Sequence, residues 1–153
     1  MIVNNKLDKA FGPVGVSAGI FLSIAGIVFT ILNGWSALSL LVIGAFVGFT
    51  NTCAKIDIEN KRVKLSNNIF GFISLGKWVE VNSKMKLGTI DSNMIWRAYS
   101  RSNRKLDISQ KDIRIILYTS TMQQIMPLMK THSKKSAEEN LERLCDQLGV
   151  QKA

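Results

Sequence analysis

An uncharged run constrains this chain more than any other feature. From Ala10 to Ala54, 45 residues in succession, no Asp, Glu, Lys, Arg or His occurs. A helix that crosses the hydrocarbon core of a bilayer, about 30 Å thick, needs about 20 mainly apolar residues. The run is therefore long enough for two helices. We expect a short N-terminal segment over residues 1–10, a membrane segment over 11–54 and a polar domain over 55–153.

The uncharged run has a natural break in its middle. Phe11–Leu32 supplies 22 residues for a first helix, and Ala37 to about Thr52 supplies a shorter second one. Between them, Asn33–Ser36 reads NGWS, which is rich in turn formers. Trp35 in this turn would lie at the membrane interface, where amphipathic rings are favoured. The pattern predicts a transmembrane helical hairpin.

Basic residues flank this hairpin on one side only. Lys6 and Lys9 precede the first helix and the turn carries no basic residue, whereas four follow the second helix: Lys55, Lys61, Arg62 and Lys64. The positive-inside rule then places both termini in the cytoplasm. A cleaved signal peptide is the alternative, but the first apolar stretch exceeds the usual core of about 7–15 residues, no clear cleavage site follows, and a second apolar segment comes at once.

Small residues recur at helical spacing within the run. One stripe consists of Gly15, Gly19 and Ser23, and the other of Gly44, Gly48 and Thr52. In lipid, close backbone approach through such stripes lets helices pack. The two helices would pack on each other within one chain, or alternatively form a homo-oligomer or bind a partner. Ion and proton pathways usually need ionisable groups inside the membrane, so a transporter acting alone is not expected.

The polar part reads as strands followed by one helix. Lys55–Leu65 alternates apolar and charged residues around a turn, and Phe70–Val81 continues with glycines expected as bends. Further strands follow, among them an edge strand that contains Pro127. A capping box at Ser136 and Glu139 then predicts the start of an amphipathic helix. Its apolar stripe, which ends before a C-terminal cap at Gly149, comprises Ala137, Leu141, Leu144, Cys145 and Leu148.

Motifs for enzymatic chemistry are missing from the sequence. It contains no phosphate-binding glycine loop, nucleophile elbow or metal-ligand spacing, and His132 is the only histidine. Cys53 and Cys145 are expected as buried free thiols in a reducing compartment. We expect no catalytic residue, metal, cofactor or small-molecule substrate, and no enzyme.

Six or seven antiparallel strands closed by a C-terminal helix is the order of a PH-like (pleckstrin-homology-like) barrel. The chain resembles a family of small bacterial membrane proteins, common in Bacteroidota, that join two transmembrane helices to a PH-like domain. The resemblance is carried by Ile56–Leu65, Phe70–Trp78, the loop before Asp112–Tyr118 and the terminal helix Ser136–Gly149. It implies a binding or scaffolding module at the cytoplasmic face of a bacterial inner membrane.

Two basic groups are candidates for binding lipid or a partner. The first is Lys61, Arg62 and Lys64, at the place where eukaryotic PH domains often hold phosphoinositides. The second lies in a predicted loop, Ile95–Leu106, and comprises Arg97, Arg101, Arg104 and Lys105. Residues 51–153 carry 18 Lys and Arg against 10 Asp and Glu. Each basic residue near an anionic leaflet contributes about 1 kcal/mol within a Debye length of about 8–10 Å.

Three functions remain open at this stage. The first is a membrane-anchored interaction or scaffold protein, such as an accessory subunit of an envelope complex, which would offer a strand edge or groove to a protein partner. The second is a sensor of anionic lipid. Nucleic-acid binding comes last, because no RNP-like, helix-turn-helix or KH signature accompanies the basic loop.

Overall fold

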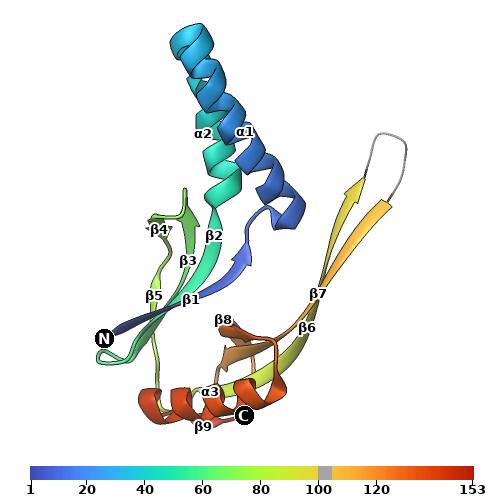
Figure 1. The fold of residues 1–153 in the computed structure, drawn as a ribbon. Coiled ribbons are helices and arrows are strands. Elements are labelled where there is room, and N and C mark those ends of the chain that lie inside the picture. Colours follow the sequence, from blue (N-terminus) through green and yellow to red (C-terminus); the bar gives the residue numbers. More distant parts are fainter. Residues whose placement is uncertain (100–104) are drawn as a thin grey trace. The chain divides into compact units, whose positions relative to one another are not determined.

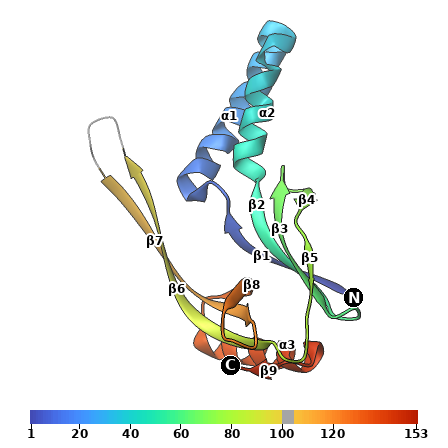
Figure 2. The ribbon, with the colours of Figure 1, turned by 180° about the vertical axis from the view of Figure 1, so that it is seen from behind.

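The computed structural model describes residues 1–99 and 105–153. An apolar helix lies near the N-terminus, and a mostly-β domain with a curled, half-barrel sheet and a C-terminal helix follows (Figures 1 and 2). The chain forms two compact units. The β domain comprises Met1–Leu7, Cys53–Ser66 and Gly76–Ala153, and the helical unit comprises Asp8–Thr52 and Asn67–Leu75.

The helical unit is built on two antiparallel helices that lie side by side (Figure 1). Helix α1 spans Gly12–Asn33, the short 3₁₀ helix η1 spans Gly34–Ala37, and α2 spans Leu38–Phe49. The predicted helix–turn–helix order is confirmed, but the second helix ends before Thr52. Thr50 is already extended (φ −70°, ψ 128°), because the chain leaves the helix there to enter a strand.

The N-terminal segment, to which the sequence analysis assigned no element, is a strand. Strand β1 (Ile2–Lys9) pairs with β2 (Asn51–Asp57). The Ala10 amide donates to the Thr50 carbonyl at 3.3 Å, between the ends of these strands that lead into the helices. The helices are therefore inserted between two neighbouring strands, so the chain leaves the sheet at the end of β1 and re-enters it beside that strand as β2.

The first sheet continues from β2 through a turn into β3 (Arg62–Ile69), and both β4 (Ile73–Leu75) and β5 (Trp78–Glu80) pair with β3. This confirms the predicted hairpin and the predicted break in Phe70–Val81. Gly76 separates β4 from β5, and a Cβ atom there would lie 2.1 Å from the carbonyl oxygen of Leu65. Only glycine permits this close approach to β3.

The second sheet has the order β8-β7-β6-β9, formed by Gln124–Thr131, Lys105–Tyr118, Lys86–Tyr99 and Gln151–Lys152 respectively. The prediction of a loop over Ile95–Leu106 is wrong for most of its length, since β6 continues to Tyr99 and β7 starts at Lys105. Charged residues suggested a loop, but the alternation of period two continues through them. Pro127 lies on the edge strand β8 as predicted, beside a register shift between Ile115 and Ile116 of β7.

Helix α3 (Lys134–Leu148) packs one face into the β domain. The predicted capping box is wrong, because the helix begins three residues earlier than expected, with Ser133 as the N-cap and without a side-chain capping bond. The C-terminal cap is confirmed: Gly149 is left-handed (φ 69°) and its amide donates to the Cys145 carbonyl at 2.8 Å. The core combines both sheets and α3, and its fully enclosed members include Ile56, Val63, Leu87, Ile115, Leu117, Leu128, Leu141 and Leu148.

Candidate functional site

The helical unit presents its large apolar side chains outward. More than half of the surface is exposed for Phe21 and Ile31 of α1 and for Ile43 and Phe49 of α2. Several positions at which the two helices meet are instead small: Gly19, Ser23, Gly26, Gly44 and Gly48. A helix pair in a soluble protein buries its large apolar side chains. The outer surface of this pair therefore suits an apolar surrounding medium.

Backbone contact between the helices depends on these small residues. A Cβ atom on Gly19 would lie 2.4 Å from the Gly48 nitrogen, and one on Gly44 would lie 2.5 Å from the Ser23 nitrogen. Gly26 lies equally close, with its Cβ position 2.5 Å from backbone nitrogen of α2. The Ser23 hydroxyl donates to the Gly19 carbonyl at 2.9 Å, so its polar group is satisfied within α1. Such close approach is how helices pack in lipid.

Two residues of the predicted stripes, Gly15 and Thr52, do not lie between the two helices. A Cβ atom on Gly15 would meet the Phe11 side chain of its own segment at 2.7 Å, not α2. Thr52 belongs to β2, where its hydroxyl donates to the Asn67 side chain at 3.1 Å. Gly26 was missed because the stripe was followed only in steps of four residues. The separation of seven between Gly19 and Gly26, two helical turns, was the available signal.

The lengths of the two helices differ. The 22 residues of α1 extend over about 33 Å, whereas the 12 of α2 extend over about 18 Å. Within the described residues, one helix, Gly12–Leu32, is long and apolar enough to cross a membrane, and Gly34–Phe49 forms a shorter apolar helical segment. The prediction of two crossings therefore remains a prediction for α2.

The first basic group lies at the start of β3 and is largely engaged within the domain. Arg62 donates to the Asp57 carboxylate at 2.9 Å, and its guanidinium lies 4.9 Å from the centre of the Trp78 ring. The Lys64 ammonium lies 5.8 Å from the same ring. Lys61 occupies the preceding turn in a left-handed conformation (φ 44°) and is exposed. Cation–aromatic contacts of this kind hold Arg62 and Lys64 on the protein surface.

Asp57 organises the turn from which this group projects. Its carboxylate accepts from the Asn60 side chain at 2.8 Å and from Arg62. These hydrogen bonds, that from Asn60 first and that from Arg62 second, hold the pKa of Asp57 below its ordinary value. A charged Asp57 thus fixes the turn and the direction of Arg62 together.

The second basic group is divided between the two long strands. Arg97 of β6 and Lys105 of β7 both pair with Asp107, at 3.0 and 3.3 Å. Partial desolvation tends to raise the pKa of Asp107, but hydrogen bonds from Arg97 and Lys105 outweigh it and the pKa is lowered. Arg101 and Arg104 lie outside the described residues. The negative charge of Asp107 therefore offsets part of the positive charge of Arg97 and Lys105 within the hairpin itself.

Beyond the body of the sheet, β6 and β7 continue as a two-stranded ribbon (Figure 2). Strand β8 pairs with β7 only from Ile113 onward, and β9 pairs with β6 only at Lys86 and Leu87. We call residues 91–99 and 105–111 the distal ribbon. Cross-strand pairs share a face, so one face is apolar and carries Met94, Trp96, Leu106 and Ile108, while the other carries Arg97, Asp107 and Lys111.

A buried ion cluster, missed by sequence reasoning, lies where the ribbon joins the sheet. The Asp112 side chain is fully enclosed and accepts from Arg114 at 3.1 Å and from Lys130 at 2.8 Å. Burial tends to raise the pKa of Asp112, but the bonds from Arg114 and Lys130 prevail and the pKa is lowered. Asp112 lies within β7, and no local pattern in the sequence marks its pairing with Lys130 of β8.

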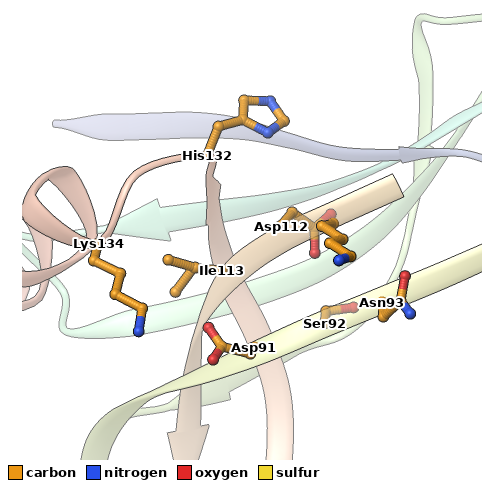
Figure 3. A pocket seen from close by; sticks show the side chains of 8 residues that line it. Asp91, Ser92, Asn93, Asp112, Ile113, His132 and Lys134 are labelled. Carbon is orange, nitrogen blue, oxygen red and sulfur yellow. The ribbon is translucent and has the colours of Figure 1, made fainter. Parts of the chain in front are cut away.

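A pocket of about 430 Å³ lies beside this cluster. It is lined by Asp91, Ser92 and Asn93 of β6, by Lys111, Asp112 and Ile113 of β7, and by His132 and Lys134 before and within α3. In Figure 3, Lys134 and Asp91 approach one another at one side, whereas the His132 ring points away from both. Both acidic and basic side chains line the pocket, and the carboxylate of Asp112 is already paired with Arg114 and Lys130.

The remaining reactive side chains are enclosed or isolated. Cys53 is fully buried, and Cys145 is partly buried on α3. Burial raises the pKa of the Cys145 thiol, with the charge of Asp146 adding to the effect, so this thiol is a poor nucleophile at neutral pH. Within residues 1–99 and 105–153, no three His, Cys, Asp or Glu side chains gather as metal ligands would.

Comparison with known proteins adds no assignment: no family model, no curated protein and no solved structure matches this chain.

Proposed function

We propose that this protein is a membrane-anchored interaction module. Helices α1 and α2 lie in the lipid as a hairpin, and the β domain binds a protein partner through the apolar face of the distal ribbon. The observation that carries the proposal is the reversed packing of the helical unit, with small residues between the helices and large apolar side chains outside. The many exposed apolar side chains on the outer surface of α1 and α2 need an apolar environment.

The pairing of β1 with β2 supports one orientation of this hairpin. Because the strands that enter and leave the helices are hydrogen-bonded neighbours, both ends of the hairpin would emerge on the same side of the membrane. The basic residues beside these ends, among them Lys9 and Lys55, favour the cytoplasmic side of a bacterial inner membrane. Trp35 and Ser36 of η1 would then face the opposite side. With η1 included, the shorter arm reaches about 26 Å, close to the hydrocarbon thickness.

Cysteine accessibility tests the hairpin in the full chain. In a background with Cys53→Ala and Cys145→Ser, we expect Ser36→Cys to react with a membrane-impermeant maleimide in intact cells. Ser83→Cys, in an exposed turn of the β domain, should react only after lysis. Equal labelling of both positions in intact cells, or labelling of Ser83→Cys alone, would contradict the proposed topology.

The PH-like character of the β domain is part of the same proposal. Two sheets with mainly antiparallel pairing and a helix near the C-terminus that packs on the core support it, as does the resemblance to small two-helix bacterial membrane proteins. A protein partner is favoured over a lipid headgroup because the described cations of both basic groups, apart from Lys61, lie against Asp57, Trp78 or Asp107. On the apolar face of the ribbon, Leu106 is 55% exposed, and Met94, Trp96 and Ile108 are partly buried. Partners of this fold often bind along strands.

Site-specific photo-crosslinking tests the partner surface. Leu106 and Ile95 are matched positions, 55% and 52% exposed, on opposite faces of the distal ribbon. We expect a photo-reactive side chain at Leu106 to give a discrete protein adduct in cells, and the same group at Ile95 to give several-fold less. Ile108→Glu, on the apolar face, should abolish the adduct at Leu106. Adducts to lipid alone would favour the lipid sensor instead, and equal adducts at both positions would refute the choice of face.

A further inference from the structure

A short apolar loop belongs to the same compact unit as the helices. It is the turn Phe70–Phe72 between β3 and β4, whose register pairs Ile69 with Ile73. Phe70 and Gly71 both adopt left-handed backbone conformations, with φ of 55° and 82°. For a bulky aromatic residue such as Phe70 this conformation is costly, and it persists only where the surroundings hold it.

Contacts with the end of α2 hold this loop in place. The Phe70 amide donates to the Thr50 hydroxyl at 3.4 Å, and the Phe70 ring meets the Phe46 ring edge to face, with 5.8 Å between centroids. Phe46 in turn contacts Phe11 at 5.5 Å, and Phe72 stacks on Phe70 at 6.3 Å. Four aromatic rings therefore form a continuous row from the start of α1 to the tip of the loop.

The outer side chains of this loop are exposed on the surface of the helical unit. Phe72 is 77% exposed, and Ile73 and Leu75 are about half exposed. No charged residue occurs from Leu65 to Gly76, whereas Lys64 and Lys77 flank this stretch. An aromatic tip with basic residues on either side is the composition of protein segments that lie in the headgroup region of a bilayer.

We infer that Phe72, Ile73 and Leu75 insert into the membrane interface as a second lipid contact, beside the end of the helical hairpin. The inference rests on the proposed anchoring of α1 and α2, because the row of rings continues their lipid-facing surface. At the interface, the strained Phe70 turn serves to direct Phe72 outward. The contact needs no particular headgroup: it recognises an interface, and the exposed Lys77 beside the stretch adds attraction to anionic lipid.

Depth-dependent fluorescence quenching tests this contact in the full chain reconstituted into vesicles of phosphatidylcholine and phosphatidylglycerol. In the background with Cys53→Ala and Cys145→Ser, an environment-sensitive dye would be attached at Phe72→Cys. Val28→Cys, on the exposed side of α1, reports the proposed anchoring, and Ser83→Cys reports the aqueous phase. The quenchers are lipids that carry a nitroxide at a shallow or a deep acyl position.

We expect shallow nitroxides to quench the dye at Phe72 several-fold more than the dye at Ser83, and deep nitroxides to quench the dye at Val28 most strongly. Quenching at Val28 without quenching at Phe72 would overturn this inference and leave the anchoring intact. Absence of quenching at both would overturn the anchoring as well. A dye at Phe72 that is shielded from nitroxide lipids and from aqueous iodide alike would show that protein covers the loop, which also overturns the inference.

Discussion

Neutralising Asp112 should destabilise the β domain more than any other single charge change on the long hairpin. Asn has nearly the same shape as Asp, so the substitution Asp112→Asn leaves the packing of β7 intact. It removes the charge that faces both Arg114 and Lys130 at 2.8–3.3 Å. Arg114 and Lys130, both largely buried, then lose the carboxylate that they share, and breaking a buried ion pair in this way is costly.

The size of the effect follows from burial. The Asp112 side chain is 0% exposed, and those of Arg114 and Lys130 are 12% and 9% exposed. Removing one partner of such a pair typically costs about 3–5 kcal/mol. With a urea dependence of about 2 kcal/mol per molar, the midpoint of unfolding should fall by about 1.5–2.5 M.

The chain contains a matched control on the same strand. Asp107 also pairs with one arginine and one lysine, but its side chain is 38% exposed, so solvent screens its charge. Urea unfolding of the full-length protein in mild detergent, followed by near-UV circular dichroism, should show a much smaller shift for Asp107→Asn. Equal shifts for the two variants would refute the argument that burial of the cluster, and not ion pairing as such, stabilises this region.

The dependence of stability on pH gives an independent check. The pKa of Asp112 is lowered from its ordinary value of 3.8 in the folded protein, so folding favours the ionised form. Its contribution is fully present above about pH 3.8 and is lost as the pH falls toward the folded value. We expect the wild-type midpoint to fall across this acid range and the Asp112→Asn midpoint to fall less. Parallel curves would show that Asp112 does not take part in this linkage.

Three further substitutions test the packing. Gly19→Leu should separate the helices, because its Cβ atom would lie 2.4 Å from the Gly48 nitrogen, and should lower the stability of the protein by about 1–3 kcal/mol. Thermal inactivation of this variant in detergent should be faster than that of the control variant Ala18→Leu, whose substitution lies on the exposed side of α1. Leu141→Ala should lower the free energy of unfolding by about 2–5 kcal/mol in urea, since Leu141 is buried in the core. Gly149→Ala should cost about 1 kcal/mol in the same assay, because its backbone is left-handed, and no change would argue against that cap.

Local patterns predicted the elements that depend only on neighbouring residues. Alternation gave the β2–β3 hairpin, and helical spacing gave the buried face of α3. Pro127 marked an edge strand because proline lacks an amide donor wherever it lies. The loop over Ile95–Leu106 was predicted wrongly because charged residues also occur on the exposed face of a projecting ribbon, and β1 was not predicted because its partner β2 follows more than 40 residues later.

The candidate sites show the same division between local and long-range information. The basic residues could be listed from the sequence, but their engagement by Asp57, Trp78 and Asp107 depends on cross-strand pairs. The Asp112 cluster was missed for that reason, since Lys130 reaches it from the neighbouring strand. Pairing across strands depends on register, and a single residue of slip would reverse which side chains meet.

By itself, the sequence determined that most of the 45-residue uncharged run forms apolar helices and that a polar, mostly-β domain follows, because composition and period are local properties. The tertiary structure decided which small residues let α1 and α2 touch, that β1 pairs with β2 across the helical insertion, and that Phe70 and Phe72 extend a row of rings from the helices. Each of these contacts joins residues far apart in the chain, and only the packed backbone brings them within reach.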